Sequence, residues 1–346
     1  MRVEDFIYGK SENYSYIERN DFCVVGIGGA GTNTINRIYN LARNKFYTIS
    51  INTDISHLSN INADKKILLN LPKGLGTGGD PNLGYKAAFS ARDEILNVLK
   101  GFKVIFIVSG FGGGTGTGAT QVITKIALDT GALVINIVTL PFKAEGSRYK
   151  KAVEGIKELT KVAKTLILLD NNKLLENSPR YLPIERAFKV MDQLIFMIIY
   201  SFHEMIYSKS NLHISYSEVK NFFSQGKLST IFYNEGSIDN IDYIIKNIVD
   251  TSLADINISS STRAIVFITT GEELDLDILM RKIIGGISSQ LAYNENITPG
   301  YVVDRSLGNN VRILVLVTNV MIPIIEEKSV IIEQKNNFSK NQNFYL

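Results

Sequence analysis

The stretch VSGFGGGTGTGATQVI, residues 108–123, decides how the rest of the chain is interpreted. It holds six glycines and no charged side chain, between an apolar run and a segment with helical spacing. It lacks the lysine of a GxxxxGK[ST] P-loop, so phosphate binding would rest on backbone N–H groups and on the positive end of the next helix. Glycines let amides approach phosphate oxygens, and Thr115 and Thr117 can add hydroxyl contacts. We therefore predict a loop that cradles a di- or triphosphate.

Around this loop, short apolar runs alternate with amphipathic segments. The pattern predicts strands near 22–28, 46–52, 104–110, 132–140 and 165–170, and helices that include 32–42 and 80–99. Alternating strands and helices are typical of an α/β fold with a parallel sheet covered on both faces. Ligands of such sheets bind at the carboxyl ends of the strands.

Composition and charge restrict the function classes. The 346 residues are 45% hydrophobic, and 37 basic residues nearly balance 34 acidic ones without a block of like charge. We therefore expect no nucleic-acid surface. The single cysteine, Cys23, excludes an internal disulfide and is expected in the core, in a reducing compartment. The apolar runs are too short to span a bilayer, so we predict a soluble cytoplasmic protein without direct membrane insertion.

A second glycine-rich segment, GIGGAGTNTINRI at 26–38, has the spacing of a dinucleotide fingerprint. Asp54 follows at about the distance at which a nicotinamide-binding fold places its acidic residue. No constellation of His, Lys and Tyr for hydride transfer accompanies the fingerprint, which disfavours an oxidoreductase.

The segment GFGGGTGTGAT, residues 110–120, resembles the phosphate loop of the tubulin and FtsZ superfamily of GTPases. Further segments match in order from about residue 20 to 322, and DNNKL with AFKVMDQL resembles archaeal-type FtsZ. The resemblance implies a Rossmann-like GTPase domain at 21–183, joined by a central helix at 184–208 to a smaller α+β activation domain at 209–322. Residues 1–20 would form an extension and 323–346 a tail.

The resemblance also implies a set of GTP- or GDP-binding residues. The segment at 26–38 would contact the diphosphate and ribose, the loop at 110–120 would hold the phosphates from the other side, and GLGTGGDP at 74–81 would close on the γ-phosphate. Family members usually have two residues between the glycine of PFxxEG and the arginine that follows it. This chain has one, so we place a one-residue deletion there and assign the contact with the ribose and the phosphate edge to Arg148. The implied set is Gly29, Ala30, Gly31, Thr32, Asn33, Asp54, Thr77, Gly78, Gly79, Gly112, Gly113, Gly114, Thr115, Gly116, Thr117, Glu145 and Arg148.

The base site depends on a helix predicted from Ile184 to Tyr207, about 36 Å long at 1.5 Å per residue. Phe188 and Asp192 are four residues apart and share a face, so the ring can stack on guanine while the carboxylate accepts from its N1 and N2 donors. Adenine lacks that pair of donors. Asn171 would complete the base edge.

The segment NLHISYSEVKNFF at 211–223 bears on hydrolysis. In the family it reads Asn-x-Asp-x-x-Asp, or ends in Glu, and enters the nucleotide site of the next subunit. Here the three positions are His213, Ser215 and Glu218. We expect Glu218 to orient and partly deprotonate the attacking water in trans, with weaker contributions from Ser215 and His213.

Cofactor and partners follow from the resemblance. Because no lysine is expected at the phosphates, Mg²⁺ would bridge them and keep several waters, without a protein cage of carboxylates. Head-to-tail self-assembly is expected, at a mid-cell division ring, with a possible adaptor or membrane tether on the tail. Asp54 and Asp80 can equally be turn residues, and the tail can equally be a frayed terminus. Because the loop at 211–218 departs from the family pattern, a GTP-binding filament scaffold with little turnover is the alternative function.

Overall fold

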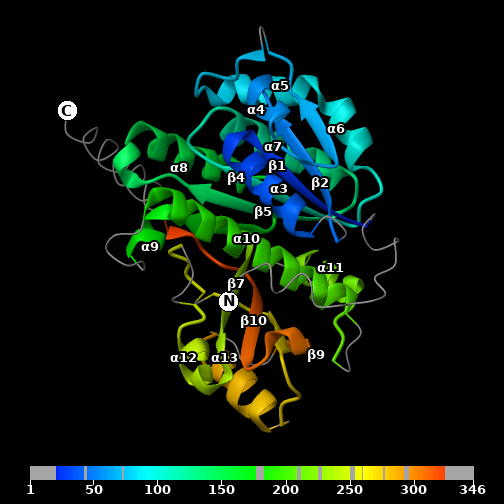
Figure 1. Cartoon of the computed structure of the whole chain (residues 1–346), viewed down its shortest axis with the longest axis vertical. Helices are drawn as coiled ribbons and strands as arrows, with labels where there is room; N and C mark the ends of the chain where they lie inside the picture. Colours follow the sequence, from blue (N-terminus) through cyan, green and yellow to red (C-terminus); the bar gives the residue numbers. More distant parts are fainter. Residues whose placement is uncertain are drawn as a thin grey trace, which may run out of the picture.

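The computed structural model describes residues 21–42, 45–71, 74–176, 183–208, 212–224, 228–249, 254–258, 260–275, 277–291 and 296–323. The expected N-terminal extension, Asn211 and nearly all of the expected tail lie outside these residues. The domain boundaries stay a prediction, although two separate sheets stand on either side of a long helix (Figure 1).

The first sheet has six parallel strands in the order β3-β2-β1-β4-β5-β6. Five of them are the predicted apolar runs, which are buried on both faces as parallel strands usually are. The sixth, β3, escaped prediction because it is a short edge strand with two exposed lysines. The strands are β1 Phe22–Ile27, β2 Tyr47–Asn52, β3 Lys65–Leu68, β4 Val104–Gly110, β5 Leu133–Leu140 and β6 Leu166–Asp170.

Helices cover both faces of this sheet. Side chains alternate along β1, so that Phe22 and Val24 pack in a cluster with α3 and α10, while Val25 and Ile27 pack in a cluster with α5, α6 and α7. α8 covers the ends of β5 and β6 on the latter face. The helices are α3 Gly28–Ala42, α4 Ile55–Ser59, α5 Pro81–Ser90, α6 Arg92–Leu99, α7 Thr115–Asp129, α8 Ser147–Leu159, α9 Asn171–Glu176 and α10 Ile184–Tyr207.

The second sheet is mixed, with order β7-β10-β8-β9. Strands β7 and β8 flank β10 antiparallel, and β9 pairs parallel with β8. One face packs under α12 and the helical segment η4–α13, while the other faces α10 and α11. The elements are α11 Tyr216–Ser224, β7 Ser229–Ser237, α12 Ile241–Lys246, β8 Ala264–Thr270, η4 Ile278–Ile284, α13 Gly285–Ser288, β9 Ile297–Val303 and β10 Asn310–Thr318.

The helix α10 begins and ends where the spacing predicts and lies between the two sheets (Figure 1). Its apolar side chains share one cluster with strands of both sheets, so the two halves have a continuous core. Near its C-terminal end, Glu204 accepts a hydrogen bond of 2.8 Å from Arg312 of β10, and both side chains are buried. A buried ion pair of this kind fixes how α10 and β10 meet, since separating the charges would leave one unpaired.

His203 of α10 makes stability depend on pH. Its ring is 1% exposed and packs against Phe22, Phe46 and Tyr207, with centroids 4.7–5.3 Å apart. Burial, with a smaller effect of Lys45, lowers the pKa of His203 to about 3. In the unfolded chain the pKa of His203 is near its usual value of about 6.5. Below that pH the unfolded chain binds a proton at His203 that the folded chain does not, so the free energy of unfolding decreases.

We therefore expect the folded protein to lose about 2 kcal/mol through His203 between pH 7.5 and 5. Urea unfolding of wild type and His203→Phe at both pH values measures this, because the variant keeps the ring packing without the titration. Equal losses in the two proteins would contradict the assignment.

Candidate functional site

The strand order reverses between β1 and β4, which is where open α/β sheets bind ligands. Both glycine-rich segments lie at the carboxyl ends of these two strands. The first is not a loop: α3 begins at Gly28, directly after β1, four residues earlier than the predicted helix. Gly29, Ala30 and Gly31 therefore form a first helical turn, whose backbone N–H groups have no partners within the helix.

Some glycines bring the two helix starts together. A Cβ on Gly28 would lie 2.8 Å from the amide nitrogen of Gly116, and one on Gly31 would lie 2.2 Å from the carbonyl oxygen of Val108. A Cβ on Gly116 would lie 2.3 Å from the carbonyl oxygen of Gly110. Side chains at these positions would separate α3 from β4 and from the start of α7, so the close approach depends on glycine.

Other glycines border empty space. A Cβ on Gly29, Gly113 or Gly78 would meet no atom within 4 Å. These positions belong to three different segments around the carboxyl ends of β1, β2 and β4, and all three present bare backbone. A cradle of this kind fits a phosphate chain, whose oxygens need amides without a side chain in between.

Gly114 and Gly112 pack closely against other parts of the protein. A Cβ on Gly114 would lie 2.1 Å from the hydroxyl oxygen of Thr77, and one on Gly112 would lie 2.8 Å from the carbonyl oxygen of Arg148. A side chain at Gly114 would thus displace the segment around Thr77. Gly112 and Gly114 therefore need glycine for packing against the protein itself.

The segment 74–80 is built from glycines in the left-handed region. Gly74, Gly76, Gly78 and Gly79 have φ between +59° and +83°. Its ends are held: the amide of Gly76 donates to the carbonyl oxygen of Thr53 at 3.2 Å, and Asp80 caps α5 by accepting from Asn82. The Lys151 ammonium of α8 donates to the carbonyl oxygen of Gly79 at 2.8 Å, a contact that sequence reasoning missed.

Three threonines of the implied nucleotide-binding set make hydrogen bonds within the protein through their hydroxyl groups. Thr115 shares a 2.6 Å hydrogen bond with Thr53, and Thr117 accepts from the amide of Gly112 at 2.8 Å. The buried hydroxyl of Thr32 donates to the carbonyl oxygen of Gly28 at 2.8 Å and bonds to His57. These hydrogen bonds hold the backbone of the cradle segments in place.

Asp54 has a structural role as well. Its carboxylate accepts from the amide of His57 at 3.0 Å and so caps α4, which is the turn-residue alternative that the sequence left open. Asp80 caps α5 in the same way.

The predicted base-site pair is on one face of α10, as expected. The Phe188 ring is 44% exposed, with the ring of Phe142 at a centroid distance of 6.2 Å. Asp192 is mostly buried; Thr34 donates to one of its oxygens at 2.5 Å and Arg37 pairs with the other at 2.5 Å. Burial raises the pKa of Asp192, while Thr34 and Arg37 act in the opposite direction.

Three asparagines lie around this region. Asn171 follows β6 directly and is 7% exposed, and its side chain makes no hydrogen bond within the part of the chain that the structure describes. Its neighbour Asn172 accepts from the amide of Lys143, which places the start of α9 beside Phe142. Asn33 is exposed on α3, one residue before Thr34. Planar stacking and carboxylate acceptors suit guanine chemically.

Glu145 and Arg148 form an ion pair at 2.5 Å, and Glu145 also accepts from the amide of Phe142 at 3.0 Å. Because the carbonyl of Arg148 lies against Gly112, this pair stands beside the glycine-rich loop at 110–120. Its position is compatible with contact to a ribose or phosphate edge.

The segment 212–218 has a compact conformation. Ile214 is buried and anchors it, whereas His213 and Glu218 are exposed. Glu218 accepts from both the amide and the hydroxyl of Ser215 at 2.7 Å, and its own amide donates to that hydroxyl at 3.2 Å. This reciprocal arrangement is a capping box at the start of α11. It lowers the pKa of Glu218.

Glu218 is far from the cradle. Next to it on α11, the Tyr216 hydroxyl donates to the carbonyl oxygen of Lys103 at 3.1 Å, and the Lys220 ammonium donates to that of Gly131 at 2.8 Å. Lys103 and Gly131 precede β4 and β5, so α11 contacts the amino edge of the sheet, whereas the cradle is at the carboxyl edge. The seven residues of β4 alone span about 23 Å.

Among the described residues, no group of three or more His, Cys, Asp and Glu side chains is arranged to hold a metal ion. No helix in the described ranges has both the length and the apolar character needed to cross a membrane.

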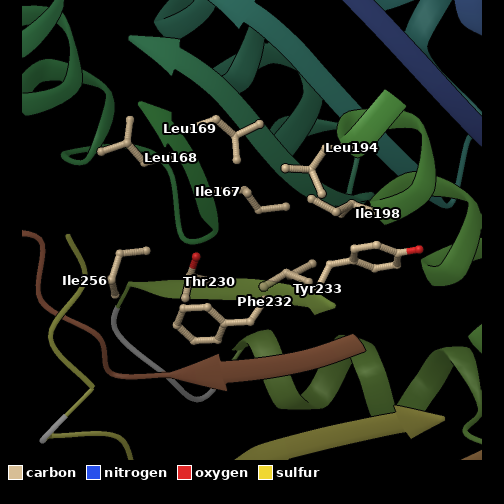
Figure 2. A pocket seen from close by; sticks show the side chains of 10 residues that line it. Ile167, Leu168, Leu169, Leu194, Ile198, Thr230, Phe232, Tyr233 and Ile256 are labelled. Carbon is tan, nitrogen blue, oxygen red and sulfur yellow. The ribbon is translucent and has the colours of Figure 1, made fainter. Parts of the chain in front are cut away.

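A small cavity of about 20 Å³ lies away from the cradle, where β6 and α10 meet β7. Figure 2 shows Leu169, Leu194 and Ile198 on one side of it and Phe232 on the other. Its volume suits about one water molecule, so it is no candidate for a nucleotide.

Known proteins resemble the chain over most of its length. A profile of the GTPase domain of the tubulin/FtsZ family matches residues 21–179. Cell division protein FtsZ 2 of Methanocaldococcus jannaschii is 39% identical over 311 residues, which cover 88% of this chain and 81% of that protein. Cell division protein FtsZ 2 of Halobacterium salinarum is 37% identical over 300 residues, 86% of this chain and 76% of its own length.

A solved structure agrees with these relatives. The FtsZ dimer of M. jannaschii superposes with a TM-score of 0.78 at 35% identity, covering 87% of this chain and 88% of that one. A CetZ2 protofilament of Haloferax volcanii reaches a TM-score of 0.73 at 18% identity, a similarity of fold alone.

Proposed function

The chain belongs to the tubulin/FtsZ family and is an FtsZ-like GTPase, and on that premise we propose that copies assemble head to tail and complete one another's hydrolytic sites. Each contact would bring the 212–218 segment of one copy onto the cradle of the next. Such a contact is heterologous and does not close on itself, so it yields a filament.

The observation that carries this proposal is the separation of Glu218 from the phosphate cradle. The two lie at opposite edges of one parallel sheet, with α11 bonded to the carbonyls of Lys103 and Gly131 at the amino edge. A chain cannot bring its own Glu218 to its own cradle while the sheet is intact. Translating one copy along the strands brings the two edges together, and the M. jannaschii FtsZ structure that superposes on this chain is a dimer.

Within the cradle, guanine would stack on Phe188 and donate to Asp192 and Asn171. The N–H groups of Gly29, Ala30 and Gly31, and those of Gly113 to Gly116, would hold the phosphates, with Asn33, Glu145 and Arg148 at the ribose side. The segment 74–80, including Thr77, would close on the terminal phosphate. Mg²⁺ bound by phosphate oxygens and water would offset phosphate charge, which suits a site with few carboxylates.

Glu218 would orient the attacking water and accept its proton. Ser215 supports the carboxylate through the capping box, and His213 is exposed beside it. The same box ties up one carboxylate oxygen and lowers the pKa of Glu218, which makes it a weaker base. That observation favours slow turnover and supports a second candidate function, a GTP-bound filament scaffold.

The relatives carry the name cell division protein, and we place this chain in the same process, at a division ring. Binding of a division adaptor or membrane tether by the tail belongs to this proposal as well.

Phosphate release measured against protein concentration, with light scattering in parallel, tests the function. We expect specific activity to be low in dilute protein and to rise above a threshold at which scattering also appears. Activity per molecule that stays constant at high dilution would contradict assembly-dependent hydrolysis. Scattering with GTP but without phosphate release would favour the scaffold.

A further inference from the structure

Lys151 stands where the phosphate cradle, the segment 74–80 and α8 meet. It lies on α8, on the face that also carries Arg148 and Gly155, three residues before it and four after it. The backbone of Arg148 contacts Gly112, and Gly155 packs on Thr117 and Phe111. This face of α8 is therefore pressed against the glycine-rich loop. From it, Lys151 reaches across to the carbonyl oxygen of Gly79 at 2.8 Å.

The Lys151 ammonium has N–H donors available to bind an anion. It is half-buried, and within the described ranges no Asp or Glu lies at ion-pair distance from it. Nearby Arg148, by contrast, is paired with Glu145. An ammonium has three N–H donors, and Gly79 uses one of them. A hydrogen bond from such a group to a phosphate oxygen would be stronger than one to a carbonyl.

The position of Lys151 along the sheet edge indicates which end of the nucleotide it faces. The base-site residues follow β5 and β6 or lie on α10: Phe142, Asn171, Phe188 and Asp192. The segment 74–80 is bound on the β2 side, where Gly76 bonds to Thr53 and Leu75 pairs with Asp54. Since β1 and β4 separate β2 from β5, a nucleotide with its base at β6 directs its terminal phosphate toward Gly79.

From this geometry we infer that Lys151 is the residue by which the site distinguishes GTP from GDP, supplying positive charge at the terminal phosphate and at the Gly79 backbone. The inference rests on the proposed function. It also revises the expectation that no lysine reaches the phosphates.

Equilibrium binding of GTP and of GDP, in competition with a fluorescent GDP below the assembly threshold, tests the inference on the full chain. We expect Lys151→Met to weaken GTP binding about tenfold more than GDP binding, as loss of one charge-assisted hydrogen bond would. Lys150→Met is the matched control, because Lys150 is the adjacent, exposed lysine of the same helix. Lys151→Arg should keep most of the discrimination.

A purely structural role for Lys151 would weaken both nucleotides equally, so an unchanged GTP-to-GDP ratio in Lys151→Met overturns the inference. Circular dichroism and the Tm confirm folding of each variant. As a second readout, amide exchange at residues 78–80 of the nucleotide-free protein should rise in Lys151→Met and not in Lys150→Met; equal exchange also contradicts the inference. Failure of wild type to bind either nucleotide would instead overturn the proposed function itself.

Discussion

Replacing Glu218 by glutamine is expected to slow GTP hydrolysis at least about a hundredfold, the usual range for loss of a general base, while nucleotide binding and assembly persist. Glutamine keeps the shape of the side chain and can keep the capping box with Ser215, so the start of α11 should not change. The substitution removes the negative charge and the basicity that act on water. Filaments of the variant should therefore live longer.

Single-turnover phosphate release in assembled filaments measures the chemical step for this variant. Ser217→Ala is a suitable control, because Ser217 is exposed in the same turn without belonging to the capping box. Turnover of Glu218→Gln at the wild-type rate would remove Glu218 from the mechanism. The lowered pKa of Glu218 also implies that it stays ionised in mildly acidic buffer, so loss of activity there must come from another group.

The second large effect is expected at the base site. Asp192→Ala should reduce the preference for GTP over ATP by about a hundredfold or more, because a site built to hydrogen-bond a particular donor pair rejects ligands that lack it. Thr34 and Arg37 each hold one oxygen of the Asp192 carboxylate in position. Both oxygens have further lone pairs that can accept hydrogen bonds from guanine.

Calorimetric titration with GTP and ATP measures that preference. Glu185→Ala, an exposed carboxylate in the first turn of the same helix, controls for the loss of negative charge on α10. Equal affinities of wild type for GTP and ATP would refute the base-site assignment.

The sequence predicted the architecture well because its signals are local. Apolar runs marked five of six parallel strands, and uninterrupted spacing marked α10 from Ile184 to Tyr207. The glycines at 26–31 favour a loop and so predict that α3 begins at residue 32, whereas the helix begins at Gly28, where Gly31 packs tightly on Val108. β3 was missed because Lys65 and Lys66 interrupt its apolar pattern at the sheet edge.

Contacts within the site were predictable only where both partners lie on one element. Phe188 and Asp192 share a helix face, so their spacing indicated the pair. Thr34 meets Asp192 across 158 residues, and Lys151 meets Gly79 across 72, and no local pattern encodes such contacts. The Ser215-x-x-Glu218 spacing, in contrast, is a local pattern typical of a capping box, in addition to the catalytic role that the family resemblance implies for Glu218.

The central claim, that each active site is shared by two copies, is tested most directly by mixing two inactive variants. Asp192→Ala keeps Glu218 but binds GTP poorly, and Glu218→Gln binds GTP but lacks the base. In a random one-to-one filament about a quarter of the head-to-tail contacts would pair an intact cradle with an intact Glu218. Co-sedimentation should verify that both variants enter the filaments. The account predicts that phosphate release in the mixture rises to about a quarter of the wild-type rate; co-assembled filaments no more active than the sum of the separate variants would contradict it.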